Sequence, residues 1–287
     1  MDVYAILGHP IAHSLSPAMH NRAFETLKID ARYVPFQVPP PHLPDAVRGL
    51  RALGIRGANI TLPHKTAIIP LLDAIDETAQ KIGAVNTLWR EGDRLLGTNT
   101  DAEGLTRSLL EAGVQLGEAR ATVLGAGGAA RAAIVGLAQA GVRRLHVAAR
   151  KLERAQALID DLRPKLGPTE LSALTLETAE LTRAFAETDL LIQATSATLE
   201  SDPQAEPFAR SLPLHSLPKS AVVTDLVYRP IDTALLRAAA ALHLTTVDGL
   251  GMLLHQGALA FERWTGQRAP LSPMRAALLA GLQHTDM

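Results

Sequence analysis

The chain has 287 residues, of which 47% are apolar and 20% charged, with a net charge of -1 and no cysteine. This length predicts two domains, and the balanced charge gives no field that would attract nucleic acid or a membrane surface. The lack of cysteine excludes a disulfide framework and thiolate zinc sites. Because the ten histidines show no metal-ligand spacing, we predict no bound metal.

Targeting segments are not expected either. No apolar run approaches the roughly 18 residues that a membrane-spanning helix needs. The opening residues, "MDVYAILGHP", lack the basic start and cleavage site of a signal peptide. We therefore expect a cytoplasmic protein whose partner is a small molecule.

The first hundred residues alternate between strand and helix patterns. A buried strand is predicted at 3–8, followed by a helix with Ser16 as N-cap and Pro17 at its first position. A second strand leads into a helix that begins near Leu43, and a third strand is predicted at 55–62. This alternation predicts an α/β layer.

A second α/β layer is predicted after residue 101. An amphipathic helix there ends at Gly113 and precedes the strand of "ARATVLGAGG". Further strands are expected near 144–149, 188–194 and 221–226. We expect a helix directly after the glycines, at least one more helix in 150–187, a surface loop at 202–218, and a helical tail that starts with "LGMLLHQGALAFERWTG".

The glycines of "VLGAGGAAR" lie between a predicted strand and a predicted helix. Gly125, Gly127 and Gly128, with Ala130 in the third position, match the pattern that lets backbone approach a pyrophosphate at a helix N-terminus. The alternative is a tight strand-to-helix turn that binds nothing. A second strand about 20 residues further on favours a dinucleotide site.

The end of that second strand indicates which dinucleotide binds. An NAD site usually carries Asp or Glu there for the ribose 2′-hydroxyl, whereas this chain has Ala149, Arg150, Lys151 and Arg154. The alternative is a solvated basic start of a helix. Because cations are unfavourable near a helix N-terminus, their clustering there favours an anionic ligand, and we predict NADP(H).

Two serines precede the first predicted helix. Ser14 and Ser16 are two residues apart in an extended loop and so face the same way. Two hydroxyl donors beside a helix N-terminus can hold a carboxylate. The alternative is that both serines only cap the helix.

Further polar residues lie where strands of the first domain meet loops. They are Lys65 in "NITLPHK", Asn86 and Thr87 in "GAVNTL", and Asn99 and Asp101 in "GTNTDAEG". Each one alone is typical of a turn or a cap. Together, one lysine, one aspartate and several neutral hydrogen-bonding groups indicate a polyhydroxylated ligand, and a neighbouring nucleotide site then suggests hydride transfer.

Eight motifs, in order along the chain, resemble the shikimate dehydrogenase family. They are "GHPIAHSLSPAMHN", "NITLPHK", "GAVNT", "GTNTDAEG", "GAGGAAR", "QATSA", "DLVYRP" and "DGLGMLLHQGALAF". The resemblance implies reversible NADPH-dependent reduction of 3-dehydroshikimate to shikimate in aromatic amino acid biosynthesis. It implies an α/β fold with a substrate domain, 1–101 plus 249–287, and a Rossmann-like NADP-binding domain, 102–248, that hinge around the ligands.

The resemblance also implies roles for residues. Lys65 and Asp101 are the implied catalytic pair, in which the lysine stabilises the developing oxyanion and supplies the proton. The implied substrate-binding residues are Ser14, Ser16, Thr61, Asn86, Tyr228 and Gln256. The implied cofactor-binding residues are Gly125, Ala126, Gly127, Gly128, Ala129, Ala149, Arg150, Lys151, Arg154, Thr195, Leu226 and Gly249, with Glu77 as a weaker candidate.

The chain departs from the family pattern at two places. "AARK" replaces the common Asn-Arg-Thr after the second strand of the cofactor domain, although Arg150 and Arg154 keep the phosphate clamp. "QATSAT" has Gln193 where Asn is frequent and Ala197–Thr198 where a glycine-rich turn is expected. The contacts made by the loop from residue 195 onward are therefore open.

Two alternative functions accompany this prediction. One is a quinate/shikimate dehydrogenase with broader substrate or cofactor use, which the two serines and the basic ribose site disfavour. The other is a non-catalytic NADP-binding regulator, which has no need of Lys65 and Asp101. The oligomeric state is open, and a homodimer is compatible with the sequence.

Overall fold

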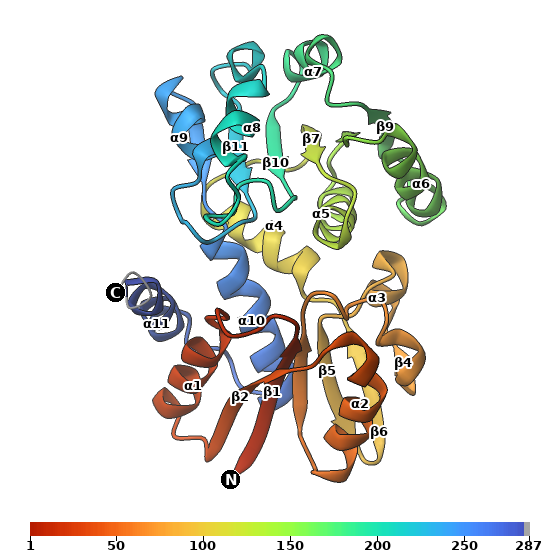
Figure 1. The fold of residues 1–287 in the computed structure, drawn as a ribbon, viewed down its shortest axis with the longest axis vertical. Helices are drawn as coiled ribbons and strands as arrows, with labels where there is room; N and C mark the ends of the chain where they lie inside the picture. Colours follow the sequence, from red (N-terminus) through yellow and green to blue (C-terminus); the bar gives the residue numbers. More distant parts are fainter. Residues whose placement is uncertain (284–287) are drawn as a thin grey trace. The chain divides into compact units, whose positions relative to one another are not determined.

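The computed structural model describes residues 1–283. Contacts within the chain divide it into two units: unit 1 is Met1–Thr100 with the chain from Leu254 onward, and unit 2 is Asp101–Leu253 (Figure 1). Both units are α/β, as the sequence predicted. The last four residues of the expected helical tail lie outside the described residues. No helix within 1–283 is long and apolar enough to cross a membrane.

Unit 1 has a mixed sheet of strand order β2-β1-β3-β5-β6-β4. Its elements are β1 (Asp2–Gly8), α1 (Ser16–Thr26), β2 (Ala31–Gln37), η1 (Pro40–His42), α2 (Leu43–Ala52), β3 (Gly57–Ile60), η2 (Ile69–Leu71), β4 (Ala74–Ile75), α3 (Glu77–Ile82), β5 (Thr87–Glu91), β6 (Arg94–Thr98), α11 (Leu271–Gln283) and most of α10 (Leu250–Thr265). β1 is parallel to β2 and to β3, whereas β5 is antiparallel to β3 and to β6.

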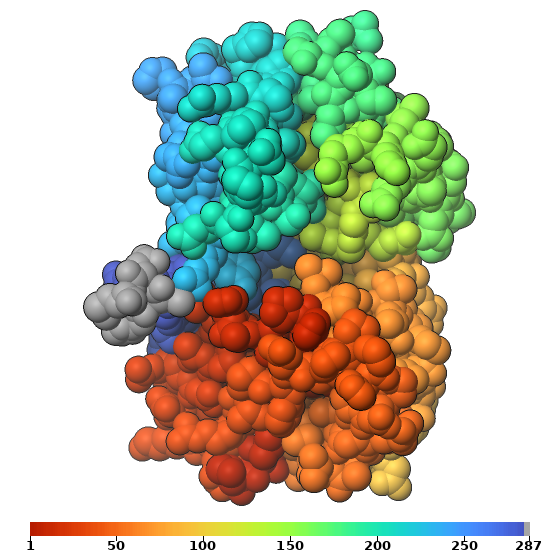
Figure 2. Space-filling model, viewed as in Figure 1, coloured from red at the N-terminus to blue at the C-terminus, as the bar shows by residue number. Residues whose placement is uncertain are grey.

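Helices cover both faces of this sheet. Leu43, Val47 and Leu50 form one stripe of α2 and belong to the same buried cluster as Ala5 and Leu7 of β1. Tyr4 points to the opposite face. There its ring stacks on Phe24 of α1, with centroids 5.2 Å apart, and on Trp264 of α10, at 5.0 Å. β1 is therefore buried on both faces, as its continuous apolar sequence predicted. Figure 2 shows the red and orange segments of unit 1 covering the visible face of that unit.

The first helix begins one residue earlier than predicted. Ser16 is its first residue, Leu15 occupies the N-cap position, and no side chain caps the helix. The expectation that Ser16 is the N-cap was therefore wrong. Pro17, in the first turn, lacks the N–H that an N-cap would otherwise help to satisfy.

Unit 2 has a six-stranded parallel sheet of order β12-β11-β10-β7-β8-β9. Its elements are α4 (Asp101–Glu111), β7 (Arg120–Leu124), α5 (Gly128–Gln139), β8 (Arg144–Ala148), α6 (Leu152–Leu162), η3 (Arg163–Lys165), β9 (Glu170–Leu174), α7 (Thr178–Phe185), β10 (Leu190–Gln193), α8 (Ala205–Ser211), η4 (Leu214–Ser216), β11 (Val222–Asp225), α9 (Ala234–Ala241), β12 (Thr245–Val247) and the start of α10. This is the doubly wound order of dinucleotide-binding domains. The strand order reverses between β7 and β10, so ligands are expected at the carboxyl ends of these strands.

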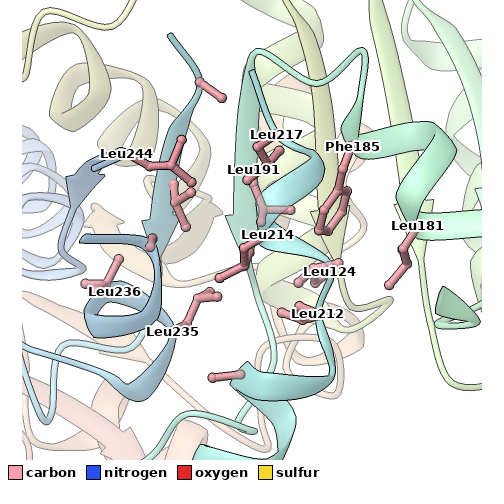
Figure 3. Packing of buried hydrophobic residues seen from close by; sticks show 14 of the residues in the cluster. Leu124, Leu181, Phe185, Leu191, Leu212, Leu214, Leu217, Leu235, Leu236 and Leu244 are labelled. Atoms are coloured by element: carbon pink, nitrogen blue, oxygen red, sulfur yellow. The ribbon is translucent and has the colours of Figure 1, made fainter. Parts of the chain in front are cut away.

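The segment 202–218 is not the surface loop that its prolines suggested. It holds α8 and η4, and Leu212, Leu214 and Leu217 are buried in the cluster that also contains Phe185 and Leu191. Figure 3 shows these leucines among the residues of the sheet and of α7. The prediction failed because the three leucines follow no helix or strand period, and irregular backbone buries them.

Candidate active site

Two loops of unit 1 meet at the carboxyl ends of β1 and β3. Because these strands are parallel, the loop that carries Ser14 and the loop that carries Thr61 and Lys65 leave the sheet at the same edge. The His9 N–H donates to the carbonyl of Leu62 at 3.0 Å, which joins the two loops. The structure therefore brings together backbone segments that lie far apart in the sequence.

The start of β5 joins the same edge. The Val85 N–H donates to the Lys65 carbonyl at 2.8 Å, which puts Asn86 beside the lysine loop. Oδ1 of Asn86 accepts from the Thr100 N–H at 2.8 Å and from the Thr87 hydroxyl at 2.9 Å. Its Nδ2 donates to the Thr100 hydroxyl oxygen at 2.9 Å. Asn86 is thus held in one orientation by buried neighbours.

A buried tyrosine is connected to this edge by hydrogen bonds. The Tyr33 hydroxyl donates to Oδ1 of Asn59 at 2.7 Å, and Nδ2 of Asn59 donates to the Thr87 hydroxyl oxygen at 3.0 Å. Burial raises the pKa of Tyr33 well above its usual value, and a hydrogen bond with Ser16 opposes this effect. Tyr33 and Asn59 were absent from the predicted site. The only signal was an Asn inside an otherwise apolar strand.

His20 packs on the same tyrosine. Its ring stacks on Tyr33 with centroids 4.4 Å apart, and burial lowers its pKa to about 3. Neither ring nitrogen has a hydrogen-bond partner among the described residues. His20 is therefore a neutral packing residue and supports the position of Tyr33 through its ring.

In unit 2 the glycine-rich loop follows β7 at the point where the strand order reverses. Gly125 has φ +117, and a Cβ added there would lie 2.8 Å from Cγ2 of Thr195, so only glycine fits. A Cβ added at Gly127 or Gly128 would meet nothing within 4 Å. No side chain caps α5. Open space in front of an uncapped helix N-terminus, including the first turn with Ala129, suits a pyrophosphate.

The cations after β8 have no acidic partners. Ala149 is buried, whereas Arg150, Lys151 and Arg154 are exposed, and none of the three has an ion pair within 1–283. At the other end of β8, Arg144 pairs with Glu170 at 2.9 Å and with Glu187 at 3.0 Å. Unpaired cations at the carboxyl end suit an additional phosphate group.

Four further predicted residues follow β10, β11 and β12 at the carboxyl edge of the unit 2 sheet. Thr195 follows β10 and contacts Gly125, as described above. A Cβ added at Gly249 would lie 2.8 Å from the carbonyl oxygen of Leu226, so Gly249 packs directly on the loop after β11. Tyr228 lies two residues further along that loop, and burial raises its pKa.

The remaining predicted residues fall in different parts of the chain. Asp101 is buried and is the first residue of α4 in unit 2. Gln256 lies in the part of α10 that belongs to unit 1. Glu77, the weaker candidate, forms an ion pair with Lys81 at 2.6 Å within α3.

The doubly wound sheet and glycine-rich loop of unit 2, together with the polar loops of unit 1, define a dinucleotide-dependent oxidoreductase built from two α/β units. Family models match most of the chain: "Shikimate dehydrogenase substrate binding domain" at residues 6–88, "Shikimate / quinate 5-dehydrogenase" at 106–250 and "Shikimate 5'-dehydrogenase C-terminal domain" at 249–279. The chain belongs to the shikimate dehydrogenase family, as the motifs indicated.

Individual relatives agree with this assignment. Shikimate dehydrogenase (NADP(+)) of Symbiobacterium thermophilum is 46% identical over 98% of this chain and 95% of its own length. The crystal structure of shikimate 5-dehydrogenase from Thermus thermophilus in complex with NADP(H) and shikimate is 41% identical, with a TM-score of 0.87 over 98% of this chain and 100% of that one. A quinate dehydrogenase from Corynebacterium glutamicum, in complex with NAD, is 31% identical, with a TM-score of 0.87 over 97% and 99%.

Proposed function

We propose that the protein catalyses the reversible NADPH-dependent reduction of 3-dehydroshikimate to shikimate. Its family supports this activity, and a relative named as an NADP(+)-dependent shikimate dehydrogenase is 46% identical over nearly the whole chain. The observation that carries the proposal is the joining of the loop of Ser14 to the loop of Thr61 and Lys65 at one edge of the unit 1 sheet. That edge collects hydroxyl and ammonium groups suited to a small hydroxylated acid.

Lys65 and Asp101 form the catalytic pair of this proposal. The bound NADPH supplies hydride to the ketone carbon. The Lys65 ammonium stabilises the negative charge that develops on the ketone oxygen and gives it a proton. Asp101 orients the ammonium and accepts a hydrogen bond from a substrate hydroxyl.

The other polar groups hold the substrate. Ser14, Ser16 and Tyr228 bind its carboxylate through their hydroxyl groups. The ring hydroxyls are bound by Thr61, Asn86 and Gln256. The rigid surroundings of Asn86 support this role, because a fixed amide binds a hydroxyl group at little entropic cost.

The cofactor groups divide into two sets. The glycine-rich segment from Gly125 to Ala129 binds the pyrophosphate, and Arg150 and Arg154, with Lys151 and Ala149 beside them, bind the ribose 2′-phosphate. Thr195, Leu226 and Gly249 line the nicotinamide position. The unpaired state of the three cations supports NADP over NAD, since a 2′-hydroxyl would leave their charge uncompensated.

We further propose that residues 1–101 with 249–287 form the substrate domain and residues 102–248 the NADP-binding domain. The division of contacts after Thr100 and Leu253 supports boundaries close to these. The cytoplasm, which supplies NADPH, is the proposed location. A homodimer is proposed as the assembly, to be tested by light scattering.

Following the absorbance of NADPH with purified protein tests the activity. Shikimate with NADP and, in parallel, quinate with NAD are the two substrate pairs, and 3-dehydroshikimate with NADPH is the reverse reaction. Reduction of NADP by shikimate at a higher kcat/KM than any other pair is expected. Turnover confined to quinate and NAD would identify a quinate dehydrogenase instead. No turnover with any pair would overturn the proposal.

A further inference from the structure

A buried aspartate fixes the loop after β11 at the carboxyl end of the unit 2 sheet. Asp225 ends β11 and is fully buried. Its Oδ1 accepts from the Val227 N–H at 3.0 Å, and its Oδ2 accepts from the Thr233 hydroxyl at 2.8 Å. The Leu226 N–H, directly after β11, donates to the carbonyl of Gln193, the last residue of β10, at 2.9 Å. Asp225 thus fixes the loop after β11, and this backbone hydrogen bond joins that loop to the end of β10.

Gln193 extends the connection on the other side. It is the last residue of β10 and is fully buried, and its Nε2 donates to the Thr198 hydroxyl oxygen at 3.0 Å. Its Oε1 accepts from the Thr195 N–H at 2.8 Å. Gln193, Thr198, Asp225 and Thr233 form what we call the Asp225 cluster.

The cluster gives a physical reason for two departures from the family pattern. Gln193 stands where asparagine is frequent, and its amide, one methylene further from the backbone, reaches Thr198. Thr198 in turn stands where a glycine-rich turn is expected, and its hydroxyl oxygen accepts the hydrogen bond from Gln193. The two departures are therefore parts of one hydrogen-bonded connection.

Each polar group of the cluster has a partner. The Gln193 amide donates to the Thr198 hydroxyl oxygen and accepts from the Thr195 N–H. From the other side, the Leu236 N–H donates to Thr233, whose hydroxyl donates to Asp225. Moving either loop would leave buried donors unpaired, which costs far more than an exposed hydrogen bond. The loops are therefore fixed relative to each other.

We propose that the Asp225 cluster is a positioning device that holds the loops of Thr195 and Leu226 against the nicotinamide half of the bound dinucleotide. The inference rests on the proposed function for the identity of that dinucleotide. The cluster has no part in holding the 2′-phosphate, because the cations proposed for it follow β8. Loss of the cluster should therefore weaken binding of the nicotinamide half alone.

Thr198→Val tests this, since it removes the hydroxyl and keeps the shape. Dissociation constants are measured by titration calorimetry for NADPH and for 2′,5′-ADP, which carries the 2′-phosphate but no nicotinamide. The Kd for NADPH is expected to rise about three- to tenfold, the equivalent of one net hydrogen bond, while the Kd for 2′,5′-ADP stays unchanged. Gln193→Met, which cuts the same link from the other side, is expected to show the same pattern if the valine variant folds poorly.

Thr188→Val is the matched control. Thr188 is equally buried and hydrogen-bonds to the Thr122 hydroxyl at 2.7 Å, but it precedes β10 and so lies at the opposite end of the sheet. It should lose stability and keep both dissociation constants. Equal Kd values for NADPH in the Thr198→Val variant and the wild type, or a parallel loss of 2′,5′-ADP binding, would overturn the inference. Binding needs no turnover, so a wild type that binds NADPH but leaves 3-dehydroshikimate unreduced would overturn only the proposed reaction.

Discussion

The hydroxyl of Tyr33 donates a 2.7 Å hydrogen bond to Oδ1 of Asn59 in the interior of unit 1. Asn59 is in turn bonded to Thr87, and Thr87 to Asn86. Buried hydrogen bonds thus connect Tyr33 to an asparagine proposed for the ring hydroxyls of the substrate.

Tyr33→Phe is expected to weaken both stability and substrate binding. Losing the hydroxyl leaves the Asn59 carbonyl group buried without its donor, at a cost of about 1 to 3 kcal/mol in the free energy of unfolding. The KM for shikimate should rise several-fold while the KM for NADP stays the same. Urea unfolding and steady-state kinetics measure the two effects. Tyr4→Phe is the control, because the Tyr4 ring is buried like that of Tyr33 but its hydroxyl has no hydrogen bond among the described residues.

Lys65→Met is expected to lower kcat by a factor of about 10² to 10⁴, as is usual for loss of a general acid. The variant should still bind NADPH, because the cofactor groups proposed here belong to unit 2. Stopped-flow measurement of NADPH consumption gives the rate, and Lys28→Met controls for removing a lysine from unit 1. A kcat within a few-fold of the wild-type value would remove Lys65 from the proposed mechanism.

Replacing Arg150 and Arg154 together with alanine is expected to reduce the preference for NADPH over NADH. Losing charge-assisted hydrogen bonds of this kind should lower kcat/KM for NADPH about ten- to hundredfold. The kcat/KM for NADH should change little, because NADH has no 2′-phosphate. Arg143→Ala is the control, since Arg143 is also exposed but precedes β8. An equal loss with both cofactors would mean that the arginines do not contact the 2′-phosphate.

Asp225 gives a prediction for pH. Burial raises its pKa from 3.8 to about 6, and hydrogen bonds from Val227, Thr233 and Thr198 oppose this rise. Between these two values the unfolded chain has lost the proton that the folded chain keeps, so stability falls as pH rises. The full effect is at most about 3 kcal/mol. The free energy of unfolding is measured for the wild type and for Asp225→Asn across this range. The wild-type value minus the variant value should decrease from about pH 4 to about pH 7. A difference that does not change with pH would contradict the raised pKa of Asp225.

Local patterns predicted most of the elements that carry the proposed site. A short stretch of sequence was enough to predict the glycine-rich loop and the strand before it. The same holds for the position of the unpaired cations after β8. The structure has these elements where they were predicted. The hairpin of β5 and β6 was missed, although Gly92 at its turn has φ +60. β9 was missed because it is a short edge strand inside a segment of helical composition.

The hydrogen-bonded clusters could not be predicted in the same way. Tyr33 meets Asn59 only because β1 lies between β2 and β3, and Gln193 meets Thr198 through the path of one irregular loop. Strand order and loop conformation are non-local properties, whereas periodicity and turn signals are local. A polar residue inside an apolar strand, such as Asn59 or Gln193, is the signal that remains visible in the sequence.

Unit 1 is completed by chain that is synthesised after the strands of unit 2. Trp264 of α10 stacks on Tyr4, and a Cβ added at Gly281 of α11 would lie 2.9 Å from a Leu15 methyl group, so α10 packs on β1 and α11 packs on the loop before α1. The strands of unit 2, in contrast, are contiguous in sequence and are all made before those helices. During synthesis, unit 2 can therefore fold on the ribosome while the first hundred residues still wait for their last two helices. Truncation before α10 would remove Trp264 and Phe261 from the face of the unit 1 sheet that Tyr4 and Phe24 line, and would leave every strand of the unit 2 sheet in place.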